Sequence, residues 1–315
     1  MKDKKFDFKD INLIPKFCIV ESRAECDTSV KFGKYNFKIP VIPANMESVI
    51  NENLAIKLAK ENYFYIMHRF NVDIAKFMIN MKNLGLYTSI SIGVNDDSYL
   101  ILRELLNNDL IPDYITIDIA HGHSIKMQKM LSYLKINFKD SFIITGNVST
   151  EEGVIDLDKW GADSVKVGIA CGSVCSTATT TGFGSYNAQA YIIDECSKVT
   201  NKPIISDGGI KTPSDITKAI VLGSTMVMSG GMLSSFIDSP GITINKDNLL
   251  YKSYHGSASK YQSNKKKRIE GTYSLNKLNE ITLIEYMDYL KECLQSSISY
   301  GGGNKLSDLY LVDWF

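Results

Sequence analysis

The chain has 315 residues, enough for one large domain or two medium ones, with 44% hydrophobic and 22% charged residues as in ordinary globular proteins. Its formal net charge is zero, so no overall field favours nucleic acid or a membrane surface as a partner. No segment reaches the roughly 18 consecutive apolar residues of a membrane span, and the charged start lacks the apolar part of a secretory signal. The six cysteines have neither a disulfide-framework spacing nor a zinc-site spacing. We therefore expect a reduced, cytoplasmic protein.

From residue 39 onward, short apolar runs alternate with longer segments of helical period. Each run is almost continuously apolar, which is typical of parallel strands covered on both faces. The expected strands are Ile39–Pro43, Tyr63–His68, Thr88–Ile92, Tyr114–Ile119, Phe142–Thr145, Ser164–Ile169, Pro203–Ser206 and Thr225–Met228. The expected helices between them include Glu52–Glu61, Asp73–Leu84, Asp97–Asn107, Ile125–Asn137, Thr150–Lys159, Asn187–Thr200 and Ser214–Leu222. Eight such strands predict an α/β fold, a (β/α)8 TIM barrel, because a doubly wound sheet usually has fewer strands in this length.

Polar or glycine-rich residues follow almost every expected strand. In a barrel these positions meet at the C-terminal face of the strands, where catalytic groups collect. They are Ala44-Asn45-Met46, His68-Arg69, Asp118 to His123, Gly146-Asn147, the loop around Cys175, Asp207-Gly208-Gly209 and Ser229-Gly230-Gly231. One such loop is usually a turn, but several that converge indicate a site.

The segment Lys166–Gly184 is the most informative of these. After a short apolar strand it becomes a loop of Gly, Ser, Thr and Cys, whose side chains are too small to build a core. Its glycines permit positive φ angles and close approach of the backbone to a ligand, and its N–H groups are suited to a phosphate. Cys175 is the only strong nucleophile in it. The alternative from this segment alone is a flexible surface loop with an inert thiol.

After the last expected strand the alternating pattern stops. Asp238–Asn279 is polar and too long for a simple connection, which is typical of a lid or mobile flap. A last helix is expected over Glu280–Ile298, followed by a glycine-rich tail. We expect residues 1–315 to form a single TIM-barrel domain with a flap at about 238–279 and a C-terminal helix.

Six stretches of the chain together resemble the IMP dehydrogenase/GMP reductase family. They run through nearly the whole sequence in the family's order, so the resemblance is specific. The stretches are Pro43 to Met46, Ile117 to His123, Gly146 to Val148, Lys166 to Ile169 with Gly172 to Cys175, Ser206 to Ile210, and Tyr254 to Ser259.

Within the family, the chain is similar to the short bacterial reductases. It has no room for the regulatory modules of the dehydrogenases, and no Arg-Tyr pair occurs between Tyr254 and Thr282. Arg268 to Gly271 instead matches the flap of the reductases. Two alternatives stay open: an IMP dehydrogenase without regulatory modules, and an inactive paralogue that only binds purine nucleotides.

The resemblance implies an NADPH-dependent oxidoreductase that deaminates GMP to IMP and ammonia in purine salvage. The Cys175 thiolate attacks C2 of the guanine ring, and a covalent thioimidate remains when the amino group leaves. Because the leaving amine needs a proton, a hydroxyl and a carboxylate are required, and we assign them to Thr177 and Glu270.

The same resemblance implies how the nucleotide is bound. Asp207 accepts the two ribose hydroxyl groups, and Met46 packs on the base. The phosphate lies on backbone N–H groups with the Ser173 hydroxyl, in a site without a positive side chain. The N–H groups belong to Gly208, Gly209, Gly230 and Gly231; Ser257 meets the purine edge, and Lys267 steadies the phosphate or the flap.

No Gly-x-Gly-x-x-Gly follows a strand, so a Rossmann dinucleotide site is excluded. In this family the dinucleotide lies across the barrel mouth instead, which here places it near Asp118 and the segment His121, Gly122 and His123. Arg69 is the candidate partner of the additional phosphate of NADPH.

The Cys175 loop departs from the family pattern in several places. Ala170 and Cys171 replace Gly-Pro, Ser176 follows the nucleophile, and Ala178 stands where the family has a basic residue. The resemblance implies potassium held by the backbone carbonyls of Ala170, Gly172 and Cys175, and a left-handed backbone at residue 170 is less favourable for Ala than for Gly. It also implies a homotetramer whose tail, Tyr300–Lys305, reaches the cofactor site of a neighbour.

Overall fold

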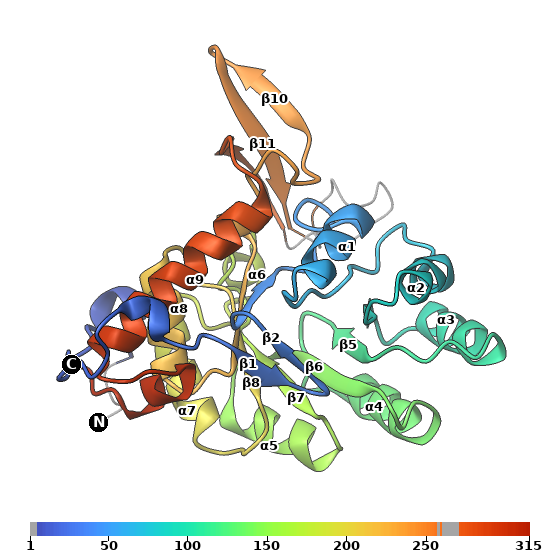
Figure 1. Ribbon diagram of the computed structural model, residues 1–315. Helices are drawn as coiled ribbons and strands as arrows, with labels where there is room; N and C mark the ends of the chain where they lie inside the picture. The colour runs from blue at the N-terminus through green and yellow to red at the C-terminus, as the bar shows by residue number, and fades with distance from the viewer. Residues whose placement is uncertain (1–4, 257–258, 260–270) are drawn as a thin grey trace.

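The computed structural model of the chain describes residues 5–256, 259 and 271–315. In this part of the chain, seven parallel strands form one curled sheet surrounded by helices (Figure 1). In spatial order they are β3 (Val41–Pro43), β9 (Met226–Ser229), β8 (Ile204–Asp207), β7 (Ser164–Val167), β6 (Phe142–Val148), β5 (Tyr114–Asp118) and β4 (Ser89–Ile92). The predicted α/β fold of the TIM-barrel type is therefore confirmed.

The predicted helices also form, with boundaries shifted by a few residues. They are α1 (Glu52–Lys60), α2 (Ile74–Asn83), α3 (Asp96–Asn107), α4 (Ile125–Asn137), α5 (Glu151–Lys159), α7 (Gln189–Ser197), α8 (Pro213–Val221) and α9 (Leu283–Tyr300). Side-chain caps set several of their starts: Asn51 accepts a backbone N–H of α1 at 2.9 Å, and Asp73 does the same for α2. Thr212 begins α8 with a capping box, and Pro213 occupies its first turn.

The expected strand Tyr63–His68 is fully buried but does not form a regular ladder. It pairs with β4 through one isolated parallel bridge, Met67 with Ile90. The hydroxyl of Tyr65 accepts the backbone N–H of Ser89 at 3.3 Å, so a side chain takes a donor that a neighbouring strand would otherwise use. This segment occupies the eighth strand position without strand geometry.

An unpredicted hairpin lies at the N-terminal end of the barrel strands. It consists of β1 (Val30–Phe32) and β2 (Tyr35–Phe37). The ring of Phe32 stacks on Tyr114 and meets Phe142 edge-on, with centroid distances of 6.0 and 5.0 Å. Because Tyr114 and Phe142 begin β5 and β6, this aromatic cluster covers the N-terminal end of the barrel. Ligands therefore enter from the opposite, C-terminal end.

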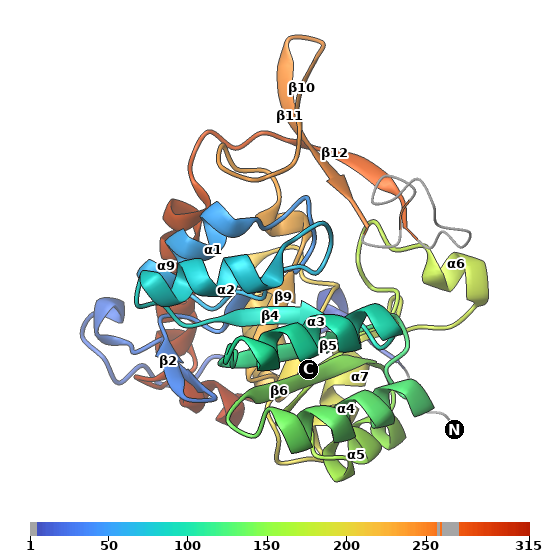
Figure 2. The ribbon, with the colours of Figure 1, turned by 90° about the vertical axis from the view of Figure 1, so that its right-hand side faces the viewer.

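The described part of the predicted flap is not irregular. It forms an antiparallel sheet of β10 (Thr243–Lys246), β11 (Leu249–His255) and β12 (Tyr273–Lys277). The β10–β11 hairpin projects away from the barrel, as Figures 1 and 2 show from two sides. The residues just before β12 pair with the loop that leads into the short helix α6 (Thr177–Thr181). The sequence pattern missed these strands because their side chains are mostly half-buried or exposed and lack an apolar run.

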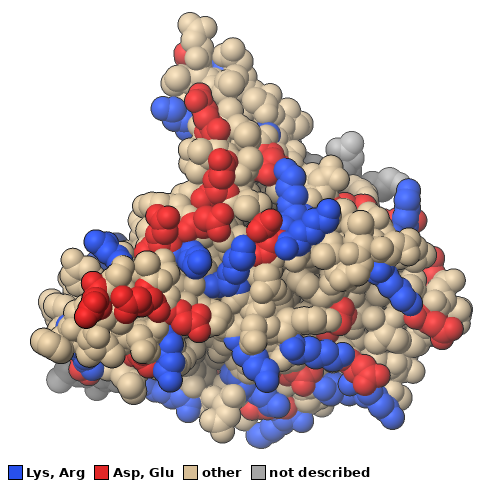
Figure 3. All heavy atoms as spheres, in the orientation of Figure 1, with Lys and Arg blue, Asp and Glu red and all other residues tan. Residues whose placement is uncertain are grey.

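Charged side chains of both signs are interspersed on the face of the molecule shown in Figure 3. Among the residues that the structure describes, no helix combines the length and the apolar character needed to cross a membrane.

Candidate functional site

A cavity of about 280 Å³ opens at the C-terminal ends of the barrel strands. Its walls come from the loops after β3, β5, β7 and the Tyr63–His68 segment, from residues within β6, β8 and β9, and from the flap sheet, so the expected convergence at this end of the barrel is observed. The lining residues that the sequence pointed to are Met46, Arg69, Asp118, Ala170, Gly172, Cys175, Thr177 and Asp207.

Cys175 is exposed at the rim of this cavity. Its Sγ lies 3.3 Å from Oγ1 of Thr177, the first residue of the short helix α6. The loop's other cysteine, Cys171, is different: burial raises the pKa of its thiol to about 12, and its sulfur hydrogen-bonds to Ser185 and Gln189. Cys171 is therefore a neutral structural thiol at neutral pH, and Cys175 is the accessible nucleophile of the loop.

The flap sheet is attached to the Cys175 loop by main-chain contacts. Gly271 forms an antiparallel bridge with Cys175, and the N–H of Thr272 donates to the carbonyl of Val174 at 2.8 Å. The N–H of Gly256 donates in turn to the carbonyl of Thr272 at 3.1 Å. Of the predicted site residues, Glu270, Ser257 and Lys267 lie outside the described residues.

A second cavity of about 320 Å³ adjoins the first and contains the predicted phosphate site. Its lining includes Ser173, Gly208, Gly209, Gly230 and Gly231 together. The two glycines after β8 have φ angles of +93° and +79°, which residues other than glycine rarely adopt. The turn that these glycines make exposes backbone groups to the cavity. The prediction of a site without a positive side chain does not match the structure, because Lys211 also lines it.

Tyr254, near the end of β11, separates the two cavities and lines both of them. It is 3% exposed, and its hydroxyl lies 3.8 Å from the sulfur of Met46. Burial raises the pKa of this phenol, although the side chain of Ser173 partly offsets the effect. The neutral phenol of Tyr254 lies between the two cavities, where its hydroxyl can form hydrogen bonds. The first cavity has room for a purine base and the second has room for a phosphate.

Three charged side chains meet at the base of the first cavity. The Nζ of Lys166 lies 2.8 Å from Oδ1 of Asp118 and 2.7 Å from Oδ2 of Asp207. Burial alone lowers the pKa of the Lys166 ammonium, but the two carboxylates raise it above its ordinary value. Burial alone raises the pKa of Asp118, but Lys166 and then Arg69 hold it below its ordinary value. Lys166 and Asp118 are therefore both charged at neutral pH.

The residues predicted for the dinucleotide divide into two sets. Arg69 and Asp118 line the first cavity, whereas His121, Gly122 and His123 are not among its described lining residues. His123 pairs with Asp156 at 2.9 Å, and the N–H of Gly122 donates to the carbonyl of Asn147 at 2.6 Å. These two contacts are with the protein itself and hold the loop after β5 in place.

The backbone carbonyls of Ala170, Gly172 and Cys175 were predicted to bind potassium. Ala170 has a φ of +63°, so this alanine adopts the left-handed conformation that glycine adopts more readily. The carbonyl of Gly172 accepts the N–H of Cys175 at 3.0 Å, which leaves it a second lone pair. In the described part of the chain, no cluster of three His, Cys, Asp or Glu side chains is arranged to hold a metal ion.

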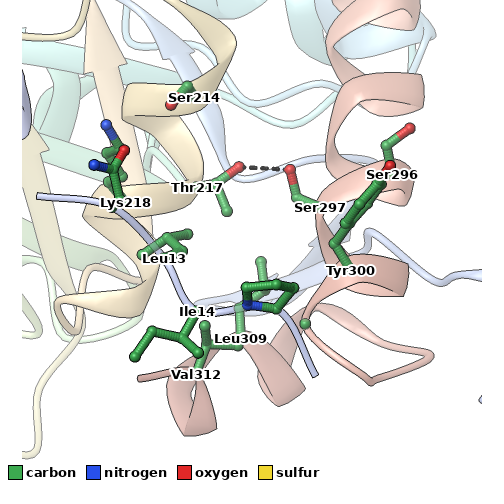
Figure 4. A pocket seen from close by; sticks show the side chains of 13 residues that line it. Leu13, Ile14, Ser214, Thr217, Lys218, Ser296, Ser297, Tyr300, Leu309 and Val312 are labelled. Carbon is green, nitrogen blue, oxygen red and sulfur yellow. Dashed lines mark hydrogen bonds between the residues drawn. The ribbon is translucent and has the colours of Figure 1, made fainter. Parts of the chain in front are cut away.

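A further cavity of about 360 Å³ lies elsewhere, between α8, α9 and the N-terminal segment (Figure 4). It shares no lining residue with the two cavities at the barrel mouth. The hydroxyl of Thr217 donates to that of Ser297 across it at 2.9 Å, and Lys218 donates to the carbonyl of Phe8. These polar groups thus bond to the protein, and no cysteine is among the described residues that line the cavity.

Several site residues carried no role in the sequence interpretation: Asn45, Asn147, Lys166, Lys211 and Tyr254. One of them had a detectable signal, because a lysine inside an otherwise apolar strand, as at residue 166, is rarely buried without a partner. The Nδ2 of Asn45 is buried in the cavity wall without a hydrogen bond of normal length among the described residues, although its side chain helps to lower the pKa of Asp118. Such a donor is suited to an acceptor on a ligand.

Comparison with known proteins shows the family to which the chain belongs. The model of the IMP dehydrogenase / GMP reductase domain matches residues 5–310. The chain therefore belongs to the IMP dehydrogenase/GMP reductase family.

Among similar curated proteins, one from Bacillus licheniformis named GMP reductase is 49% identical over 98% of this chain and 95% of its own length. A GMP reductase of Mycoplasma mycoides is 47% identical over 99% of this chain and 97% of its own length. A GMP reductase of Bacillus subtilis is 48% identical, with 98% and 95% coverage. The two alternatives left open by the sequence, a dehydrogenase and an inactive paralogue, are not favoured by these relatives.

Proposed function

We propose that this chain is an oxidoreductase that converts GMP to IMP and ammonia with NADPH. The observation that carries the proposal is the position of Cys175: an exposed thiol, 3.3 Å from a threonine hydroxyl, faces a cavity that continues into a glycine-rich compartment. A purine nucleotide matches that shape, with its ring beside the thiol and its phosphate on the glycines.

The nucleotide is held from three sides in this proposal. Its phosphate accepts N–H groups of the loops after β8 and β9, with the Ser173 hydroxyl and the Lys211 ammonium beside it. Its ribose hydroxyls donate to Asp207, whose Oδ1 has no hydrogen-bond partner among the described residues. Its base packs between Met46 and the Cys175 loop.

The covalent chemistry starts at the sulfur of Cys175. As a thiolate it forms a C–S bond to C2 of guanine, and the C2–N bond breaks as the amino group leaves with a proton as ammonia. When bound, NADPH supplies the hydride that forms the new C2–H bond. Rupture of the C–S bond then returns the electron pair to sulfur and releases IMP.

The proton for the leaving amine comes through Thr177 and Glu270 in this scheme. Thr177 is the closest hydroxyl to the sulfur that the structure describes. Support for Glu270 comes from its chain neighbour Gly271, which pairs directly with Cys175. A carboxylate one residue away along the chain is suited to relay a proton to a hydroxyl beside the thiol.

In this proposal the reacting end of NADPH enters the remaining part of the first cavity, and the rest of the dinucleotide lies across the barrel mouth. Asp118 offers a carboxylate for ribose hydroxyls, Arg69 offers a cation for a phosphate, and the buried amide of Asn45 offers a donor beside Asp118. The loop of His121, Gly122 and His123 then supports the dinucleotide from outside the cavity.

We further propose that potassium binds the carbonyls of Ala170, Gly172 and Cys175, because Ala170 retains the left-handed turn. The chain acts as one domain in a cytoplasmic homotetramer, with the Tyr300–Lys305 tail beside a neighbour's cofactor. Chromatography with light scattering, in potassium and in sodium buffers, measures the assembly and the effect of the cation.

The test of the proposed reaction follows NADPH absorbance at fixed enzyme with and without GMP. We expect GMP-dependent loss of absorbance and formation of ammonia, both abolished by Cys175→Ser. The buried Cys196→Ser is the matched control, since Cys196 lies on α7 away from the cavity. Turnover of IMP with NAD instead, or nucleotide binding without turnover in either direction, would contradict the proposal.

A further inference from the structure

Lys166 is the only positively charged group that the structure places between the two carboxylates at the base of the first cavity. Its side chain is 3% exposed, whereas those of Asp118 and Asp207 are 19% and 21% exposed. The cation is therefore inside the barrel and the carboxylates face the ligands. Its third N–H points toward the sulfur of Met228 at 4.0 Å.

The strand arrangement shows how one side chain reaches both carboxylates. Lys166 is on β7, Asp207 is on the adjacent β8, and Asp118 is on β5, beyond β6. The ammonium reaches β5 across Gly146 of β6, which pairs with Lys166 in the ladder. A Cβ at residue 146 would lie 2.6 Å from Cβ of Lys166, so the glycine provides the space for this crossing.

Fold stability does not account for a buried cation at this position. Removing a lysine from water is unfavourable, and replacing a buried ion cluster with apolar side chains of similar volume is often neutral or stabilising. The neighbours of Lys166 in β7, Val165 and Val167, are apolar and buried, as an ordinary barrel core requires. What the ammonium adds is a fixed orientation of two carboxylates that belong to different subsites.

We propose that Lys166 is a shared positioning residue, which orients Asp207 for the nucleotide ribose and Asp118 for the dinucleotide at the same time. The inference rests on the proposed function, because it takes these two carboxylates as acceptors for two different ligands. Asn147 supports only one of them: its Nδ2 donates to Oδ2 of Asp207 at 2.7 Å and to the carbonyl of Gly168. Loss of Lys166 therefore affects both subsites, whereas loss of Asn147 affects the nucleotide subsite.

The experiment measures dissociation constants of GMP and NADPH separately, by calorimetry and by NADPH fluorescence, in the full-length protein without turnover. Lys166→Gln should weaken each ligand about tenfold or more, as expected when a charge-assisted hydrogen bond is lost. Asn147→Ala, the matched control, should weaken GMP and leave NADPH within about threefold, a small effect on this scale. The thermal midpoint of each variant verifies that it is folded.

A double-mutant cycle separates positioning from a general structural effect. If Lys166 acts on NADPH through Asp118, Lys166→Gln should weaken NADPH much less in an Asp118→Asn background than in the wild type, while its effect on GMP persists. Additive effects on NADPH would overturn the inference, as would an effect on one ligand alone. If Lys166→Gln does not fold, Gly146→Ala displaces the ammonium without removing it and carries the same prediction for both ligands.

The wild-type protein distinguishes the two proposals. If it binds neither GMP nor NADPH, the proposed function fails. If it binds both and Lys166→Gln binds them with unchanged affinity, the proposed function stands and the shared positioning role is wrong.

Discussion

Gly146→Ala is the substitution whose effect follows most directly from distances in the structure. The new Cβ would lie 2.6 Å from Cβ and 2.8 Å from the carbonyl oxygen of Lys166, against ordinary contacts of 3.4–4 Å. The carbonyl oxygen belongs to the backbone of β7 and the Cβ is attached directly to it, so neither atom can rotate away. The strands β6 and β7 must separate locally, and the Lys166 ammonium must move from its two carboxylates.

The expected loss of stability is about 1–3 kcal/mol, the usual effect of overpacking in a core. For a chain of 315 residues, an unfolding entropy of about 2.1 cal/mol/K per residue means that the thermal midpoint falls by about 1.5 °C for each kcal/mol. Displacement of Lys166 should also raise the dissociation constants of GMP and NADPH together, each by about tenfold. Differential scanning calorimetry measures the first effect, and ligand titration measures the second.

Gly85→Ala is the matched control. Gly85 has a φ of +67° and no atom within 4 Å of the position of a Cβ, so alanine there introduces backbone strain without a clash. It lies between α2 and β4, at the end of the barrel opposite the cavity. The control should lose about 1 kcal/mol of stability and no ligand affinity. Wild-type affinities in Gly146→Ala would refute the steric reasoning.

Three further predictions concern single side chains. Thr177→Val should reduce kcat about 100-fold or more, because the Thr177 hydroxyl contacts the thiol of Cys175. Thr179→Val, on the same helix, should leave kcat within about threefold, because the Thr179 hydroxyl bonds to the carbonyl of Ser176 instead. Equal rates in the two variants would exclude the proton relay. Lys211→Met should raise the KM for GMP about tenfold, make this KM less dependent on salt concentration and leave kcat unchanged. An unchanged KM would show that Lys211 is not part of the phosphate site. Burial lowers the pKa of His68 to about 4, so the unfolded state binds more protons between about pH 4 and 6.5 and stability should rise by about 3 kcal/mol across that window. Denaturant unfolding at several pH values should show this rise in the wild type and a smaller one in His68→Asn, which keeps an acceptor for the Phe70 N–H; identical pH dependence would contradict it.

The barrel could be predicted from sequence because each of its strands is recognisable in a short stretch of residues. A strand of a parallel sheet is apolar on both faces and therefore gives a continuous apolar run, such as Tyr114–Ile119. The Tyr63–His68 segment shows the limit of this reasoning. Its apolar run correctly predicts burial, but whether a buried run makes ladder bonds depends on its neighbours, and here the Tyr65 hydroxyl takes one of the donors.

The flap strands and the charged cluster were out of reach for a related reason. The β10–β12 sheet is held by pairing between residues up to 26 positions apart, as between Tyr251 and Lys277, and its exposed faces leave no period in the sequence. The contact of Lys166 with Asp118 spans two strands and exists only because residue 146 lacks a side chain. The sequence interpretation assigned Asp118 to the site and gave Lys166 no role, because the ion pair between them is a property of the folded barrel.

The geometry of β11 has a mechanical consequence. This single strand of seven residues spans about 20 Å, from exposed Leu249 at the hairpin turn to Tyr254 and His255 at the barrel mouth. Because it is continuous and paired on both edges, it behaves as a lever rather than a hinge. A tilt of the β10–β11 hairpin therefore shifts the Tyr254 phenol between the two cavities. A contact on the outer hairpin, far from the Cys175 thiol, would then change the width of the passage between the two cavities.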